Sequence, residues 1–462
     1  MDRQTPIMDA IAQVCGNSKA RFCMPGHKGD SGFFGGDMLS CDITELPGTD
    51  NLHNAKGAIL KSQTLHAEYI GAEAVYYTTG GSTACVLAML SLFGGRKVIF
   101  PRGVHLSAAN AINMYGLNPV FLDSPPCDYP ATVQVDAIKK ALRENKDAAA
   151  VFITYPNYFG LCCDIESIAN IAHKAGLPLV VDAAHAAHFA YSGLLPAAPS
   201  YTGADIWTES AHKTLPAMNQ CACLCVGRNS FIDKNKVLRA LLNIQTTSPS
   251  YVLLASLDYA HAYMRDTGEN ELYRIISVTG RFENMVNALS GFTCPEIVQP
   301  GVIGKDPLKL VIDVGGTGYT GLAVKKRFAE QGIYVEAADF KNILLMLSVG
   351  NTASQLERLY ESLRRVPKVR GKNIYFSPYS MPPATKYSQN FVNCGNIEKV
   401  RIERSPGRIA ARGAGVYPPA EAVVIRGQLI SVEIAGYLIE ARRQGFDLFG
   451  TQDDNIFVFK EK

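Results

Sequence analysis

The sequence predicts an α/β protein whose main β-sheet is mostly parallel and covered by helices on both faces. From about Ala74 to Val226, short apolar runs alternate with helical patterns, an order that is typical of such sheets. At 462 residues the chain is too long for one ordinary core, so we expect two or three domains. A hydrophobic fraction of 47% with 19% charged residues indicates a soluble globular enzyme or binding protein.

Four apolar runs are the candidate strands of this sheet, and they span residues 97–100, 119–122, 150–154 and 179–182. A Gly-rich turn at residues 80–83 leads into an apolar helix that starts near Ala84. In open α/β sheets, ligands bind beyond the carboxyl ends of the strands. We therefore expect functional groups at Asp182 and in the loop of residues 154–157.

The second half of the chain predicts smaller domains. A strand at residues 308–314, a helix at 322–331 and two strand-like stretches before Gly350 indicate an α+β domain. A strand-like run at 422–425 and a helix at 431–444 indicate a third segment. We expect an N-terminal segment, a large domain, a small α+β domain and a C-terminal domain, over residues 1–55, 56–295, 296–366 and 367–462.

Charge and hydropathy exclude several classes of partner. The net charge is only +3, and basic clusters such as residues 325–327 are short, so we expect no nucleic-acid partner. The first residues lack the apolar core of a signal peptide, and no apolar run reaches membrane-spanning length. We therefore expect a cytoplasmic protein with no membrane partner, whose twelve cysteines are reduced thiols.

Metal ligands are a weaker interpretation of the cysteines and histidines. Cys221, Cys223 and Cys225 alternate in an apolar run, which favours one face of a buried strand over the Cys-x-x-Cys spacing of zinc sites. A site formed by His173, His185 and His188 is the alternative. We expect no metal.

The most specific chemical signal is Lys213, about thirty residues after Asp182 at the end of an apolar run. An enzyme that uses pyridoxal 5'-phosphate needs a lysine for a Schiff base and a carboxylate that keeps the pyridine nitrogen protonated. Lys213 and Asp182 can supply both. The alternative is that Asp182 caps a helix and Lys213 is a surface lysine.

Other residues fit the phosphate and the ring of this cofactor. Backbone amides from Gly81 onward, with the hydroxyls of Ser82 and Thr83, form a possible anion site at a helix N-terminus. Further candidates are Ser210, His212 and Thr214 for the phosphate, His105 as an aromatic lid over the ring, and His185 near Asp182 or the substrate. Helix caps, loop histidines and buried structural histidines are the alternatives for these positions.

With these residues in view, the chain resembles the ornithine, lysine and arginine decarboxylases among the fold type I pyridoxal-phosphate enzymes, in the short form without an N-terminal wing domain. The resemblance runs nearly end to end. The motifs that carry it are Met24-Pro25-Gly26-His27-Lys28-Gly29, residues 42–48, Asp50-Asn51-Leu52, Gly81-Ser82-Thr83, His105 with Ser107, residues 182–185, residues 210–215, residues 247–251 and Tyr417-Pro418-Pro419.

The resemblance implies an aspartate aminotransferase-like fold with a seven-stranded sheet in the large domain, and it implies roles for single residues. Lys213 would hold the cofactor as a Schiff base, Asp182 would pair with its ring nitrogen, and His105 and Ala184 would lie on the two ring faces. The phosphate would be held by Ser82, Thr83, Ser210 and His212. Lys213, His185 and His212 are the candidate acids. Thr247 and Ser248 would reach the neighbouring subunit's site, which implies a homodimer or a higher homo-oligomer.

The reaction implied is α-decarboxylation of a basic L-amino acid, with a slight preference for arginine over lysine and ornithine, giving agmatine or a diamine plus CO2. Glu45, Asp50 and Glu336 are candidates for binding the cationic side chain. The chain departs from the family pattern at Leu106, Ala183, Ala186 and Ala420, which leaves substrate choice open.

Two other function classes remain alternatives. An aminotransferase or elimination lyase would use the same lysine and aspartate, with Arg404 or Arg408 as a carboxylate clamp in an aminotransferase. A non-catalytic protein that keeps the fold and the ligand is the second alternative, although an intact Lys213 argues against it.

Overall fold

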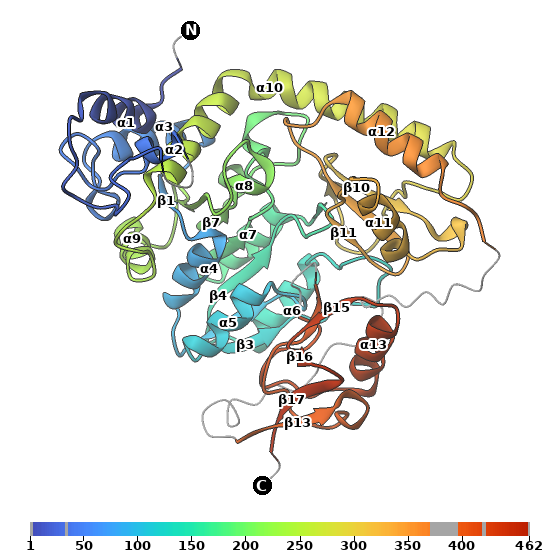
Figure 1. The fold of residues 1–462 in the computed structure, drawn as a ribbon. Helices are drawn as coiled ribbons and strands as arrows, with labels where there is room; N and C mark the ends of the chain where they lie inside the picture. Colours follow the sequence, from blue (N-terminus) through green and yellow to red (C-terminus); the bar gives the residue numbers. More distant parts are fainter. Residues whose placement is uncertain (1–2, 33–35, 370–395, 418–421, 461–462) are drawn as a thin grey trace. The chain divides into compact units, whose positions relative to one another are not determined.

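We describe the protein from a computed structural model, which covers residues 3–32, 36–369, 396–417 and 422–460 (Figure 1). The chain divides into two compact units. The first combines Met1–Leu92 with Ala172–Tyr273, and the second combines Phe93–Ile171 with Arg274–Lys462. Two of the crossings between units fall inside helices, in α7 (Ile165–Lys174) and in the 37-residue α10 (Tyr251–Asn287).

The largest sheet has seven strands in the order β1-β8-β7-β6-β4-β2-β3. Strand β6 is parallel to β7, and β2 is parallel to both β3 and β4. Strand β8 is antiparallel to its neighbours β1 and β7. The predicted α/β class with a large, mostly parallel sheet is therefore confirmed.

The first unit holds four of these strands and the helices nearest to them in sequence. Its strands are β1 (Ala74–Thr78), β6 (Leu179–Asp182), β7 (Ile206–Glu209) and β8 (Ala222–Val226). Its other helices are α1 (Pro6–Asn17), α2 (Met38–Cys41), α3 (Ala58–Ile70), α4 (Gly81–Ser91), α8 (Ala211–Thr214) and α9 (Lys234–Leu242), with short 3-10 turns at Leu52–Asn54, Phe189–Tyr191 and Pro199–Tyr201.

Strand β8 illustrates the apolar, fully buried sequence that favours a strand in the middle of this sheet. Every residue from Ala222 to Val226 is buried, as expected for a strand covered on both faces. Cys223 and Cys225 alternate with apolar residues and are fully buried, which confirms the prediction of a buried strand at this position. Helix α3 ends by a similarly local rule, because Gly71 adopts the left-handed conformation at φ 76° and its N–H bonds to the Ala67 carbonyl.

The second unit contributes strands β2 (Lys97–Phe100), β3 (Asn118–Phe121) and β4 (Ala148–Thr154) with helices α5 (Leu106–Met114) and α6 (Val135–Glu144). The three-stranded sheet that follows comprises β10 (Lys309–Asp313), β12 (Asn342–Met346) and β11 (Ala337–Ala338) and is accompanied by a 3-10 turn at Gly315–Thr317, α11 (Gly321–Ala329) and α12 (Ala353–Arg364). Strands β5 (Leu161–Cys162) and β9 (Gly304–Lys305) form a separate pair.

The C-terminal part of this unit builds two small sheets. They comprise β13 (Ile397–Arg401), β17 (Asn455–Phe459) and β16 (Thr451–Gln452), and β14 (Gly415–Tyr417) with β15 (Asp447–Phe449); α13 (Val432–Arg443) and the 3-10 turn Ile402–Arg404 complete it. A core of buried side chains that includes Ile434, Leu438 and Val458 joins α13 to the strands.

Most predicted elements lie within two residues of their expected bounds, but the strand predicted at residues 422–425 is wrong. Val424 makes only an isolated bridge to Ala414. The chain turns back directly afterwards, since the Gln428 N–H bonds to the Ile425 carbonyl and Gly427 adopts φ 90°, so no ladder can extend. Within the described residues, no helix combines the length and apolar character needed to cross a membrane.

Candidate active site

The predicted lysine and aspartate follow neighbouring strands of the first unit. Strand β6 ends at Asp182, which pairs with Thr208 of the parallel strand β7. Strand β7 ends at Glu209, and Ser210 then precedes the single-turn helix α8 that carries Lys213. Because the two strands are parallel, both segments leave the sheet at the same edge.

Lys213 and His185 are in direct contact at this edge. The Lys213 Nζ lies 3.2 Å from the His185 Nε2. Asp182 is buried, and one of its carboxylate oxygens accepts the Ala184 backbone N–H at 3.2 Å. The Ser210 N–H also bonds to the Ala184 carbonyl. An amine, an imidazole and a buried carboxylate are thus gathered within two short segments.

His212 is held in one tautomer by Cys221, the residue just before β8. Its Nδ1 lies 2.8 Å from the Cys221 carbonyl oxygen, so Nδ1 must donate a proton there. Burial lowers the pKa of His212, the bond to Cys221 opposes this shift, and the nearby charge of Lys213 adds to it. The neutral ring with its proton on Nδ1 is thus favoured, so Nε2 could donate to a phosphate only after the ring takes up a second proton.

Helix α4 begins with an uncapped turn beside this segment. Gly81 adopts φ 68°, which favours glycine, and its N–H bonds to the carbonyl of Gln220, next to the residue that holds His212. The N-cap residue is Gly80, which has no side chain to cap the helix, and the Thr78 hydroxyl accepts the Gly80 N–H before the helix begins. Ser82 is half-buried and Thr83 is exposed. The first-turn N–H groups thus have no side-chain partner at the cap, which favours an anion.

Two buried hydroxyls add to this set of donors. The Oγ of Ser210 and the Oγ1 of Thr214 are buried and have no hydrogen-bond partner among the described residues. A buried hydroxyl without a partner is costly, and a phosphate oxygen would supply one. Together with Asp182 for a ring nitrogen and Lys213 for a carbonyl carbon, these groups fit pyridoxal 5'-phosphate.

His105 belongs to the second unit and caps helix α5. Its Nδ1 lies 3.2 Å from the Ser107 N–H and 2.8 Å from the Ser107 hydroxyl. These bonds fit the alternative interpretation, in which His105 is a loop histidine that caps a helix. Its stacking on a cofactor ring stays a prediction.

The three carboxylates predicted to bind a substrate cation differ in how fully they are engaged. Asp50 accepts backbone N–H groups at the start of α3, from Gly57 at 2.7 Å and Ile59 at 3.0 Å among others. Burial opposes ionisation of Asp50, but these backbone bonds outweigh it and lower its pKa. Glu336 accepts the Tyr158 hydroxyl at 2.5 Å, and Glu45 accepts that of Thr44. Asp50 is thus occupied as a helix anchor.

The remaining predicted residues have local roles or exposed positions. Thr247 and Ser248 are exposed just before α10. The guanidinium of Arg408 pairs with Glu398 and donates to the Phe459 carbonyl, and Arg404 ends a 3-10 turn. Pro418, Pro419 and Ala420 lie outside the described residues.

The three histidines considered as a metal site form no ligand group within the described ranges. His173 pairs with the buried Asp205 at 2.7 Å, and His185 contacts Lys213. A different group, His66, Cys223 and His261, brings its ligand atoms within 4.8 Å of one another. Sequence reasoning missed it because its members come from three distant elements with no motif between them.

The seven-stranded, mostly parallel sheet and the candidate site beside it fit a fold type I pyridoxal-phosphate enzyme. Among solved structures, the chain is similar to the lysine decarboxylase of Francisella novicida, with a TM-score of 0.81 and 17% sequence identity, covering 99% of this chain and 81% of that one. The family model of the Orn/Lys/Arg decarboxylase major domain matches residues 5–313. The chain therefore belongs to the Orn/Lys/Arg decarboxylase family.

Curated relatives agree with this membership over the whole length. The chain is 30% identical to an arginine decarboxylase of Halalkalibacterium halodurans, covering 98% of this chain and 96% of that protein. It is 29% identical to an arginine decarboxylase of Bacillus subtilis, covering 99% and 97%. The predicted family and the predicted enzyme class, a pyridoxal-phosphate-dependent amino-acid decarboxylase, are confirmed.

Proposed function

We propose that this enzyme removes the α-carboxylate of L-arginine as CO2 and releases agmatine, using pyridoxal 5'-phosphate held at the edge formed by β6, β7 and α4. The observation that carries the proposal is the meeting of Lys213 and His185 beside the buried Asp182. The curated relatives named arginine decarboxylase support arginine over the other basic amino acids.

Each residue of this edge has a part in holding the cofactor. The amides of α4 that follow Gly81, whose own N–H bonds to the Gln220 carbonyl, would bind the phosphate together with Ser82, Thr83, Ser210 and His212. Asp182 would keep the ring nitrogen protonated. Lys213 would tether the cofactor until the substrate amine displaces it. Once bound, the cofactor supplies an electron sink for the pair left behind when the carboxylate departs.

Proton delivery to the substrate α-carbon falls to Lys213 Nζ and His185 Nε2. Their 3.2 Å separation allows one proton to be shared between them. His212 is a weaker candidate, because its Nδ1 proton is bound to the Cys221 carbonyl. Ala183 and Ala186, both buried beside His185, shape the same edge and are candidate determinants of substrate choice.

A homodimer or higher homo-oligomer in the cytoplasm completes the proposal. The exposed Thr247 and Ser248 are free to reach a second subunit's site. Mixing a Lys213→Ala chain with a Thr247→Ala/Ser248→Ala chain tests this, because a shared site restores activity that neither chain has alone. Absence of any restored activity in a mixture shown to contain mixed dimers contradicts the shared site.

The substrate is tested by incubating the holoenzyme with arginine, lysine, ornithine and shorter basic amino acids and measuring CO2 and primary amine. We expect the highest kcat/KM with arginine. Lys139→Ala is a matched control for Lys213→Ala, since Lys139 is exposed and its ammonium group pairs with Asp136 one helical turn away. A keto acid as the product would instead identify an aminotransferase.

A further inference from the structure

A row of polar side chains crosses three strands of the first unit on one face of the sheet. Cys223 of β8 pairs in register with Tyr77 of β1 and with Glu209 of β7. Directly paired residues in antiparallel strands share a face. All three are at most 3% exposed, so this row is a buried polar surface.

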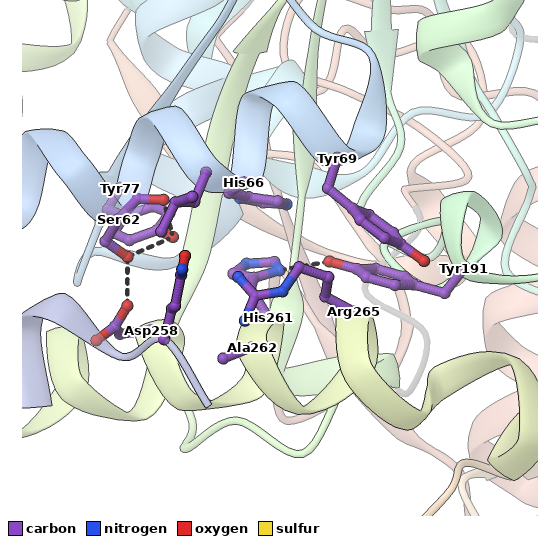
Figure 2. Close-up of a pocket in the computed structure, with 11 residues that line it drawn as sticks. Ser62, His66, Tyr69, Tyr77, Tyr191, Asp258, His261, Ala262 and Arg265 are labelled. Carbon is purple, nitrogen blue, oxygen red and sulfur yellow. Dashed lines mark hydrogen bonds between the residues drawn. The ribbon is translucent and has the colours of Figure 1, made fainter. Parts of the chain in front are cut away.

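Two helices place histidines beside this row. His66 of α3 and His261 of α10 both lie near the ring of Tyr77 (Figure 2). Their ring centroids are 3.3 Å apart at an interplanar angle of 27°, closer than the roughly 4.5–7 Å that aromatic pairs prefer. His66 is 3% exposed, and neither of its ring nitrogens has a hydrogen-bond partner among the described residues. A buried ring nitrogen without a hydrogen-bond partner is costly, and a bound metal ion is one way to satisfy it.

The cysteine thiol completes a group with the right composition for a metal ion. The His261 Nε2 lies 3.6 Å from the Cys223 Sγ. Zinc bond lengths of about 2.0–2.3 Å place neighbouring ligand atoms of a tetrahedral site roughly 3.3–3.6 Å apart. The His261–Cys223 pair already has this spacing, and the ring nitrogen of His66 completes a group within 4.8 Å.

The second ring nitrogen of His261 is also engaged as metal sites require. Its Nδ1 lies 2.8 Å from the Tyr191 hydroxyl, and Tyr191 in turn stacks on Tyr69 with centroids 5.0 Å apart (Figure 2). Metal-bound histidines commonly hydrogen-bond through their other nitrogen, which fixes the ring orientation.

We propose that Cys223 Sγ, His261 Nε2 and one ring nitrogen of His66 bind a zinc ion, with water in the fourth position. The adjacent pocket, lined by His66, His261 and Tyr191 among others, has room for about one water molecule. The two rings must separate on binding, because each imidazole coordinates in its own plane. Cys223 binds as the thiolate, and its proton leaves to solvent.

Glu209 supplies the counter-charge for this site. A divalent ion with one thiolate and two neutral imidazoles carries a net positive charge, which is costly in a buried place. Glu209 is the cross-strand partner of Cys223, and its Oε2 has no hydrogen-bond partner among the described residues. The ion would link α3, β8 and α10, so its role is to stabilise the first unit, independently of the decarboxylase reaction.

The test is metal binding by the purified full-length holoenzyme after treatment with a chelator. We expect dialysis against zinc to load one ion per chain by elemental analysis and to raise the melting temperature. The matched pair is Cys223→Ala and Cys225→Ala, since both cysteines are fully buried on the same face of β8. Cys223→Ala should lose the ion and the rise in melting temperature, and Cys225→Ala should keep both.

Cobalt(II) provides a measurement that does not depend on the cysteine variants folding. The unaltered chain should give the visible bands of a tetrahedral site and a thiolate-to-cobalt charge-transfer band, and His66→Gln should change both. Loading well below one ion per chain, equal loading of the Cys223 and Cys225 variants, or a cobalt spectrum unchanged by His66→Gln overturns the proposal. Decarboxylase activity of the metal-free holoenzyme should be unchanged at low temperature, which separates this test from that of the proposed function.

Discussion

Strand β7 separates two polar regions of the first unit that differ in how they are built. Its Thr208 pairs with Asp182 on the face that carries the candidate cofactor site, and its next residue, Glu209, pairs with Cys223 on the opposite face. The first face is supplied by short continuous segments around Asp182 and Lys213. The second is supplied by single residues from β1, β7, β8, α3 and α10. The candidate cofactor site can thus be recognised from short sequence motifs. The buried polar cluster on the opposite face is assembled from residues spread over the whole unit.

The largest expected effect is on Lys213. Lys213→Ala should lower kcat by on the order of 10³-fold or more, since it removes both the tether for the cofactor and a proton donor. Absorbance of the lysine-bound cofactor should vanish together with CO2 release. Near-normal turnover in this variant would show that the catalytic lysine lies elsewhere. It would contradict the assignment of the cofactor site to the face of β7 that carries Thr208.

Asp182→Asn should cost on the order of 10²-fold in kcat, because it removes the charge that stabilises a protonated ring nitrogen. Asp205→Asn is a useful control, since Asp205 directly precedes β7 and is as deeply buried, but its carboxylate bonds to His173 and the Leu179 N–H. We expect it to lower stability and to leave kcat per folded molecule unchanged. Equal losses of kcat in the two variants would contradict the assignment of Asp182.

Glu209 makes stability depend on pH on the opposite face. Burial raises its pKa from 4.5 to about 8, partly offset by the bond from the Trp207 indole. The folded state thus binds a proton that the unfolded state releases between these values, so this contribution is fully present below about pH 4.5 and is lost as pH rises toward 8. In the metal-free protein, ionisation of Glu209 should lower the free energy of unfolding by about 2 kcal/mol as the pH rises from about 6 to about 7.5. Glu209→Gln should lack this decrease, because glutamine does not titrate.

Urea unfolding of both proteins at the two pH values measures this difference directly. The glutamine keeps the shape of a protonated carboxyl group, so the variant should fold. Parallel pH dependence in the two proteins would show that Glu209 is ionised in the folded state.

The smallest expected effect is at Asp50. Asp50→Ala should lower the unfolding free energy by about 1.5 kcal/mol, since it leaves several N–H groups at the start of α3 without an acceptor. KM for arginine should change little, because the carboxylate is already occupied by the backbone. A large rise in KM with unchanged stability would restore Asp50 as a substrate-binding residue.

The sequence predicted the fold better than it predicted single contacts. The strands before Lys213 lie within two residues of their expected bounds because buried parallel strands are short apolar runs between turns. The prediction of a strand at residues 422–425 was wrong because the chain turns directly after Ile425. The Gln428 N–H bonds to the Ile425 carbonyl, and Gly427 adopts a positive φ. His105 was predicted from its motif, but its observed bond to Ser107 is a cap that the motif equally allows.

The sequence by itself determined the α/β class and the family, and it singled out Lys213 and Asp182 as candidates for holding the cofactor, because each of these inferences depends on short motifs along the chain. Tertiary structure decided which groups are already occupied, such as Asp50 at α3, and which are left without partners, such as Ser210 and His66. It also brought His66, Cys223 and His261 together. Hydrogen-bond satisfaction and burial are properties of neighbours in space, and those neighbours lie far apart along the chain.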